Sequence, residues 1–283
     1  GSTWTGRVIS QAKDIRYVDE PFNISIKRKH IPFTYWFEYV GNAPKNQQKK
    51  VESYLNSYLN VGNVQYLSDL FSTKLLKETR IVLGDLKNRF TKRSLIKDPI
   101  AIMSAEWIYQ KYKCDVIVLI RHPAAFIASL KIQDWQFNFN DFLKQPTLLN
   151  NYLKNYKTEI EFFSTNKKDI IDQGILLWNI IHSVIAYYKE KHGENWHFVK
   201  HEDLSKNPVS EFKKLFLQLN LDFDNKVNNY LLESTTSKDK LDLKRDSVKN
   251  IKSWKKRLTS DEIERIKKGT KEVSIKFYSD KDW

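Results

Sequence analysis

The sequence predicts an α/β fold in which a central parallel β-sheet is covered by helices on both faces. Apolar, β-branched segments typical of strands alternate along the chain with segments whose apolar residues recur at helical spacing. The clearest strand, residues 115–120 (DVIVLI), is almost continuously apolar, as a strand buried on both faces would be. No internal repeat and no Gly/Ser- or Pro-rich linker divides the 283 residues, so a single domain over residues 1–283 is expected.

Three further strands are predicted from short β-branched or aromatic segments. Residues 15–19 (IRYVD) form the first of them, and residues 94–98 (SLIKD) form a second that Pro99 ends. Residues 196–200 (WHFVK) resemble the strand at 115–120 and are expected to be buried in the same sheet. The helices between them provide the crossovers that parallel strands require.

The helices are predicted from the spacing of apolar residues. The segment 100–112, for example, carries Ile100, Met103 and Trp107 at helical intervals. The last helix has the clearest start signal, because the four residues at 259–262 (TSDE) have the pattern of a capping box. The predicted helices are 3–13, 46–58, 65–77, 82–90, 100–112, 124–131, 140–164, 170–192, 205–219, 226–233 and 260–272.

Composition narrows the possible partners and locations. The chain has 48 Lys and Arg against 34 Asp and Glu, a net charge of +14, which favours an anionic partner such as a nucleic acid, an anionic membrane, an acidic polysaccharide or a phosphate-rich cofactor. The single cysteine, Cys114, excludes an intrachain disulfide and is expected to be a buried packing residue. No leader and no stretch of roughly 20 apolar residues is recognised, so a cytoplasmic location without membrane contact is expected.

Ligands of parallel sheets bind at the carboxyl ends of the strands, so the residues that follow each strand are the candidate site. Arg121 ends the strand 115–120, and Ser129 lies two helical turns later. A guanidinium fork and a hydroxyl both suit phosphate oxygens. The alternative is that Arg121 pairs with a carboxylate and Ser129 is a small packing residue.

The two ends of the chain carry the other anion-binding candidates. Gly1, Ser2 and Thr3 precede a helix, where backbone N–H groups and hydroxyls can hold an anion, and Trp4 can stack on a base. The alternatives are a plain helix cap with Trp4 in the core, or a Gly-Ser remnant of cloning. The basic stretch at 244–255 either closes over an anionic ligand or is a solvated loop.

In combination, these motifs resemble the sulfotransferase family that uses 3′-phosphoadenosine 5′-phosphosulfate (PAPS). Residues 1–4 (GSTW) resemble the end of its phosphosulfate loop, and 120–129 resemble its 3′-phosphate motif. Residues 201–204 (HEDL) resemble a recurrent Tyr-Glu-Asp-Leu, and Arg245 with Ser247 resemble part of the segment that covers the cofactor. The motifs stand in family order, and the bacterial branch related to carbohydrate sulfotransferases is the most similar, on the segments 17–22 (YVDEPF) and 95–99 (LIKDP).

The resemblance implies a P-loop-type three-layer α/β/α fold. It also implies an enzyme that transfers the sulfuryl group of PAPS to a hydroxyl or amine and leaves adenosine 3′,5′-bisphosphate (PAP). The expected acceptor is a carbohydrate. The resemblance implies no metal and no nucleic-acid partner. The residues expected to bind PAPS are Gly1, Ser2, Thr3, Trp4, Arg121, Ser129, Arg245 and Ser247. The family's loop cation and first strand would lie before Gly1, so an N-terminally truncated chain is expected.

The general base is expected to be Glu20, because carbohydrate sulfotransferases carry a catalytic Glu in a similar place. The alternative roles are a structural carboxylate for Glu20 and base catalysis by His30. Lys97 is expected to approach the phosphosulfate or to pair with Asp98, and His122 to be structural. The aromatic and basic segment 27–36 either lines the acceptor cleft or is a packed irregular segment. Two rival functions are a non-catalytic binder of nucleic acid or acidic glycan, and an inactive sulfotransferase fold.

Overall fold

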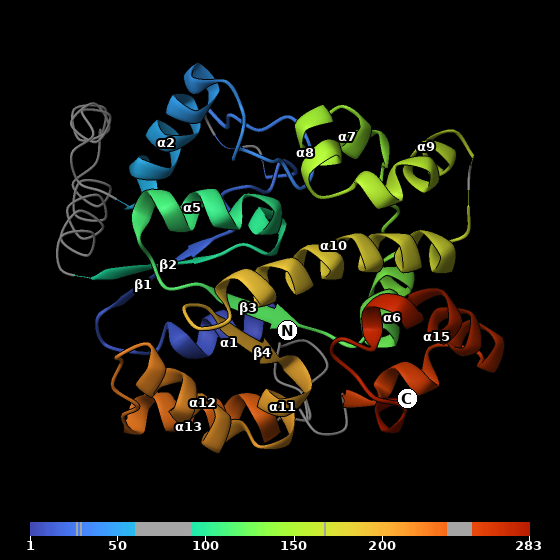
Figure 1. Cartoon of the computed structure of the whole chain (residues 1–283). Coiled ribbons are helices and arrows are strands. Elements are labelled where there is room, and N and C mark those ends of the chain that lie inside the picture. The colour runs from blue at the N-terminus through green and yellow to red at the C-terminus, as the bar shows by residue number, and fades with distance from the viewer. Residues whose placement is uncertain (27, 29, 60–91, 167, 237–250) are drawn as a thin grey trace, which may run out of the picture.

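The computed structural model describes residues 1–26, 28, 30–59, 92–166, 168–236 and 251–283 (Figure 1). The strands are β1 (Ile15–Asp19), β2 (Arg93–Lys97), β3 (Ile117–Ile120) and β4 (His197–Lys200). The α-helices are α1 (Ser2–Ile9), α2 (Lys45–Leu59), α5 (Ala105–Tyr112), α6 (Pro123–Gln133), α7 (Asn140–Leu143), α8 (Pro146–Asn151), α9 (Lys157–Thr165), α10 (Ile170–His192), α11 (His201–Lys206), α12 (Pro208–Gln218), α13 (Asn225–Thr236) and α15 (Ser260–Ser274). Short 3₁₀ helices are η1 (Pro99–Ser104), η2 (Lys154–Tyr156), η3 (Ser253–Lys256) and η4 (Asp280–Asp282).

The strands pair in parallel, which confirms a mixed α/β fold with parallel strands. β1 pairs with β2 from Ile15 opposite Arg93 to Asp19 opposite Lys97. β3 pairs with β4 from Ile117 opposite His197 to Ile120 opposite Lys200. Because ladder hydrogen bonds join only these pairs, the described strands form two two-stranded sheets instead of the one central sheet that was expected.

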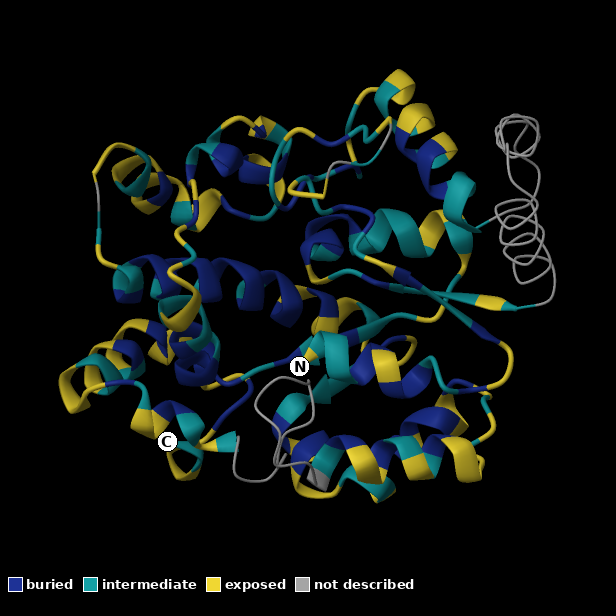
Figure 2. Ribbon diagram, turned by 180° about the vertical axis from the view of Figure 1, so that it is seen from behind, coloured by how far each residue is buried: buried dark blue, intermediate teal, exposed yellow. Residues whose placement is uncertain are grey.

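Helix α10 is the centre of the main core. It spans 23 residues, runs through the middle of the molecule in Figure 1, and is mostly dark blue in Figure 2 because more than half of its residues are buried. It packs against α6 and α15. By length and composition it would also pass for a membrane-spanning helix, but 67% of the relevant window is buried inside the fold, as expected of a core helix.

Two predicted helices are interrupted by proline. The expected helix 140–164 is wrong as a single element, because Pro146 starts α8 and the segment divides into α7, α8, η2 and α9. The expected helix 205–219 is likewise divided, since Pro208 occupies the first turn of α12. The predicted helices 65–77 and 82–90 lie outside the described residues.

A second apolar cluster holds α1 in place. Val8 and Ile9 of α1 are buried against Phe212 and Phe216 of α12 and against Leu231 of α13. On its other side, Gly6 allows α1 to approach β1 and β2, because a Cβ at this position would lie 3.0 Å from the Tyr17 ring and 3.1 Å from Lys97 Cγ. This packing fixes where the amino end of α1 points.

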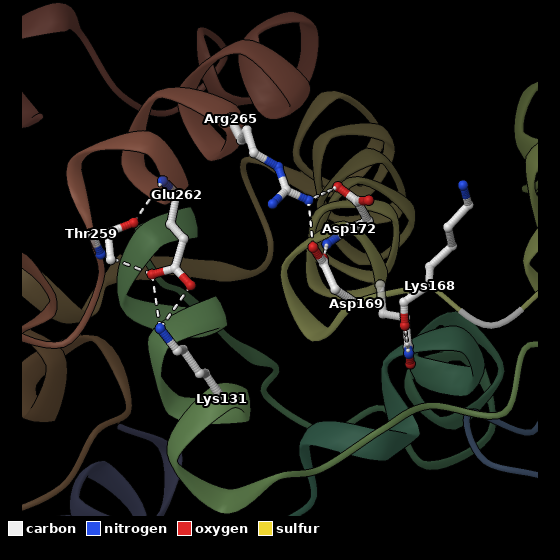
Figure 3. A network of polar contacts seen from close by, with 8 residues as sticks. Lys131, Lys168, Asp169, Asp172, Thr259, Glu262 and Arg265 are labelled. Atoms are coloured by element: carbon white, nitrogen blue, oxygen red, sulfur yellow. Dashed lines mark hydrogen bonds and ion pairs between the residues drawn. The ribbon is translucent and has the colours of Figure 1, made fainter.

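Polar contacts connect α6, α10 and α15 at the surface (Figure 3). The predicted capping box is confirmed: Thr259 Oγ1 accepts from the N–H of Glu262, whose side chain accepts from the N–H of Thr259. Lys131 of α6 donates to the same Glu262 carboxylate at 2.7 Å, and hydrogen bonds to Lys131 and Thr259 outweigh burial and lower the pKa of Glu262. Arg265 donates to Asp169 and Asp172 at the amino end of α10.

Candidate active site

The carboxyl ends of the two sheets form two groups of polar residues. Arg121 and His201 follow β3 and β4, and the start of α1 lies beside them. Glu20 and Asp98 follow β1 and β2, next to Lys97, the last residue of β2. The predicted candidates at the strand ends therefore fall into two sets. The first lies at the ends of β3 and β4, and the second lies at the ends of β1 and β2.

The first set joins the start of α1 to the end of β3. A Cβ on Gly1 would lie 2.4 Å from His201 Cδ2 and 3.0 Å from Leu119 Cδ2, so the helix start touches both strand ends. Burial lowers the pKa of His201 to about 3, and the positive charge of Arg121 adds to this effect. His201 therefore stays neutral beside Arg121, and the guanidinium is the positive charge that attracts an anion to this set.

The amino end of α1 has the properties of an anion site. The N-cap is Gly1, which has no side chain. Ser2 and Thr3 lie in the first turn of the helix, so neither of them is the N-cap. The first turn has no acidic residue, and Gly1 provides no side-chain capping hydrogen bond. The amino end of a helix favours negative charge, so the start of α1 suits an anion.

Trp4 is engaged in packing. Its indole Nε1 donates to Ser234 Oγ at 3.0 Å, and its ring meets Phe212 edge to face at 5.2 Å. These contacts attach α1 to α12 and α13. The contact geometry agrees with the alternative in which Trp4 is a packing residue, and its stacking on adenine stays a prediction.

Of the other predicted ligands of the 3′-phosphate, the structure describes only Ser129. Ser129 is half-buried, two turns into α6, and its hydroxyl accepts from Gln133 Nε2 at 3.4 Å. Arg245 and Ser247 lie outside the described residues. Trp254, which follows them, is only 2% exposed and its ring stacks on His122 at 5.2 Å, so this tryptophan packs against the end of β3.

His122 is structural in its contacts, as expected. Burial lowers its pKa to about 4, and the charges of Lys252 and Lys255 contribute in the same direction. These two lysines place the described part of the C-terminal basic stretch beside the residue that follows Arg121. Asp282 lies near the same imidazole and its negative charge opposes the effect of the two lysines.

The second set is an ion pair network at the ends of β1 and β2. The Lys97 ammonium, whose side chain is 6% exposed, donates to Glu20 Oε1 and to Asp19 Oδ1, the latter at 2.8 Å. Burial opposes the charge on Lys97, but the hydrogen bonds to Asp19 and Glu20 outweigh it and raise the lysine pKa. The expected pairing of Lys97 with Asp98 is wrong.

The carboxylate of Asp98 binds backbone N–H groups instead of Lys97. It accepts from the N–H of Phe22 at 2.6 Å and from the N–H of Ile100 at 3.0 Å, so it caps η1 and fixes the turn after β1. Burial raises the pKa of Asp98 to about 6 even though these N–H groups favour its charged form. Lys97 therefore pairs with the carboxylates of Asp19 and Glu20 at the end of β1 and not with Asp98.

Glu20 is held in one orientation. Its Oε2 accepts from Asn23 Nδ2 at 2.6 Å while Oε1 accepts from Lys97. The backbone of Glu20 has a positive φ of 42°, and its carbonyl accepts from Arg28 Nη1 at 2.6 Å. A non-glycine residue held in this region by several contacts is common at functional sites.

His30 and the aromatic segment differ from Glu20. His30 is exposed, with φ 59°, and its ring makes no hydrogen bond within the described part of the chain. Phe33 stacks on Phe22 at 4.1 Å, and Trp36 meets Trp135 edge to face at 5.5 Å. These two rings pack against the core, as the alternative of a packed irregular segment requires.

Cys114 is half-buried at the start of the segment that leads into β3. It was expected to be a buried packing residue, and its partial burial raises the pKa of its thiol, which disfavours a nucleophilic thiolate. Two cavities of about 310 and 420 Å³ lie against α9 and α10, away from both polar sets. Over the described ranges, no three His, Cys, Asp or Glu side chains gather as metal ligands.

The family of the chain is shown by one comparison with known proteins. The family model described as "Sulfotransferase domain" matches residues 1–277. A solved structure titled "Sulfotransferase Domain from the Curacin Biosynthetic Pathway" is 15% identical, covers 95% of this chain and 92% of that chain, and superposes with a TM-score of 0.49. None of the curated proteins matches the chain.

Proposed function

Since the chain belongs to the sulfotransferase domain family, we propose that it moves a sulfuryl group from PAPS to a hydroxyl or amine of an acceptor, and that this acceptor is a carbohydrate. The observation that carries the proposal is the convergence of the start of α1 with Arg121 beside His201. A single domain of the P-loop-type three-layer arrangement is part of the proposal. The proposal also assigns the basic excess to PAPS and an anionic glycan instead of a nucleic acid.

The residues of the first set fit a nucleotide with anionic groups on both the 3′ and the 5′ positions of its ribose. The first turn of α1, which has no acidic residue and carries Ser2 and Thr3, suits the 5′-phosphosulfate. Arg121 suits the 3′-phosphate, together with Ser129 and, from the stretch outside the described residues, Arg245 and Ser247. Lys252 and Lys255 add to the positive field at this end.

When bound, PAPS supplies an activated sulfuryl group, and its transfer resembles phosphoryl transfer in placing negative charge on the equatorial oxygens. The chain's own contribution is to position the two partners and to stabilise that charge. Each charge-assisted hydrogen bond of this kind is worth roughly 1.5–3 kcal/mol. The helix start and Arg121 are the groups of the described chain that provide such bonds.

Glu20 is the proposed general base. Both of its carboxylate oxygens already accept hydrogen bonds, from Lys97 and from Asn23. To accept a proton from an acceptor hydroxyl, Glu20 uses a remaining lone pair or exchanges one of these donors. His30 is the second candidate, and its exposed imidazole is not oriented by another described side chain.

The test is transfer of radiolabelled sulfuryl from PAPS to an acceptor panel of neutral and acidic oligosaccharides, amino sugars and a simple phenol. We expect label in an oligosaccharide with the wild-type chain and none with Arg121→Ala. Label only in the phenol would contradict a carbohydrate acceptor. Selective binding of PAP without transfer to any acceptor would contradict the enzyme and favour an inactive sulfotransferase fold.

A further inference from the structure

The peptide group that joins Arg121 to His122 is held by side chains at both of its polar atoms. The indole Nε1 of Trp178 donates to the Arg121 carbonyl oxygen at 3.0 Å. The N–H of His122 donates to Glu202 Oε1, also at 3.0 Å. This peptide comes directly after Ile120, the last residue of β3, so side chains from α10 and α11 satisfy it beyond the end of the strand ladder.

The partners of this peptide are themselves buried and fixed. Trp178 is fully buried and Glu202 is 8% exposed. The second oxygen of Glu202 accepts from the Tyr278 hydroxyl at 2.9 Å. Burial and the neighbouring Glu202 raise the pKa of Tyr278, so its hydroxyl stays protonated and continues to donate. A buried network whose members are all bonded is rigid.

The side chain of His122 is restrained as well. Its ring stacks on Trp254 and meets the rings of Tyr278 at 5.0 Å and Trp283 at 4.5 Å. The imidazole is 2% exposed. Neither side of the peptide can therefore rotate without breaking contacts to α10, to α11 or to the segment after α15, which lie around the end of β3 in Figure 1.

We propose that Trp178, Glu202 and Tyr278 are positioning residues that set the direction in which the end of β3 presents the Arg121 side chain to an anion. The inference rests on the proposed function, in which Arg121 binds the 3′-phosphate. None of the three needs to touch the ligand. They act through one peptide group, because their bonds to its two polar atoms hold in place the backbone segment that carries Arg121.

The inference predicts a loss of selectivity for the 3′-phosphate, which a role in stability alone would not cause. PAP and AMP differ by this phosphate, so the ratio of their dissociation constants reports on Arg121. Tyr278→Phe keeps the ring contacts to His122 and removes only the hydroxyl that orients Glu202. We expect this variant to lower the PAP-over-AMP preference about tenfold, the scale of one good hydrogen bond, while AMP affinity stays near the wild-type value.

The experiment is calorimetric titration of the full chain with PAP and with AMP, in a double-mutant cycle. The variants are Tyr278→Phe, Arg121→Ala and the two combined, with Trp178→Phe as a second route to the same peptide. Tyr156→Phe is the matched control, because it removes a tyrosine hydroxyl bonded to Ser183 elsewhere in the fold.

The expected result is that Tyr278→Phe and Trp178→Phe lower the preference, Tyr156→Phe does not, and Tyr278→Phe has no further effect once Arg121 is Ala. A wild-type preference in Tyr278→Phe would overturn the inference while leaving the proposed function intact. An equal drop with and without Arg121 would do the same. If the wild-type chain itself does not prefer PAP, the proposed function fails and the inference falls with it.

Discussion

The ammonium of Lys97 donates to the carboxylate of Glu20 across the ends of two parallel strands, and it is buried while doing so. The same ammonium binds Asp19. One lysine therefore neutralises two neighbouring carboxylates and fixes the turn that presents Glu20. This relationship gives a direct test of whether Glu20 is catalytic or structural.

Glu20→Gln is expected to lower kcat by about 10²–10⁴ while PAP affinity changes little, because the amide keeps the shape of the side chain and cannot accept the proton. The measurement is the sulfuryl-transfer rate against the calorimetric Kd for PAP. His30→Gln is the control for the alternative base and is expected to retain activity. A dead His30→Gln beside an active Glu20→Gln would reverse the assignment.

Lys97→Met is expected to destabilise the chain by about 2 kcal/mol, because it leaves a partly buried Glu20 without its counter-ion. Urea unfolding followed by circular dichroism measures the change. The matched control is Lys111→Met, whose exposed ion pair with Glu52 contributes little, so its midpoint should stay within error of wild type. Equal effects of the two substitutions would contradict the structural importance of Lys97.

Acidification is expected to destabilise the fold through its buried histidines. The pKa values of His122, His182 and His201 are lowered to about 4, 3 and 3, in each case chiefly by burial. A lowered histidine pKa means that the unfolded chain binds the proton first, so stability falls as pH drops below about 6.5. Asp98 acts in the opposite direction, because its raised pKa of about 6 lets the native state take up a proton earlier.

His122→Phe isolates one of these groups. Phenylalanine preserves a flat ring against Trp254, and neither His122 nitrogen has a hydrogen-bond partner among the described residues. The variant should therefore lose less stability than wild type between pH 6.5 and 4, by up to about 3 kcal/mol at the acid end. Paired urea titrations across that range measure the difference, and parallel curves would show that His122 is not buried as a neutral ring.

Thr259→Ala should destabilise the chain by about 1 kcal/mol, because it removes the side-chain half of the capping box that starts α15 (Figure 3). Thermal unfolding measures the effect. Thr165→Ala is the control, since its exposed hydroxyl makes only local hydrogen bonds, to carbonyls one turn back in α9 and with the neighbouring Asn166 amide. An unchanged midpoint for Thr259→Ala would mean that the cap contributes nothing measurable and that the contacts of α15 to α6 and α10 hold the helix.

Much of the fold could be predicted from local patterns. The strand at 15–19 and the helix at 170–192 match β1 and α10 to the residue, because β-branched runs and long apolar periodicity are strong local signals. The single helix at 140–164 failed because Pro146 outweighed the periodicity around it. The pairing of strands into two sheets depends on contacts between distant segments, and no local pattern specifies it.

The candidate site could likewise be predicted where it depends on local patterns, and could not where it depends on contacts between distant segments. Placing Arg121, His201 and the start of α1 at strand ends required only the rule that ligands bind there. The partners of these residues were not predictable, because Tyr278 lies 76 residues from Glu202 and Trp178 lies 57 residues from Arg121. The segment 201–204 resembles a family motif, yet nothing in its spacing indicates that Glu202 binds the peptide after β3.

The central claim is that this chain recognises the 3′-phosphate of a PAPS-type nucleotide through Arg121. Calorimetric titration of the wild-type chain with PAP and AMP, repeated on Arg121→Ala, tests it most directly. We expect PAP to bind much more tightly than AMP and this preference to disappear in the variant. Equal affinity for the two nucleotides in the wild-type chain would contradict it, as would a preference that survives the loss of Arg121.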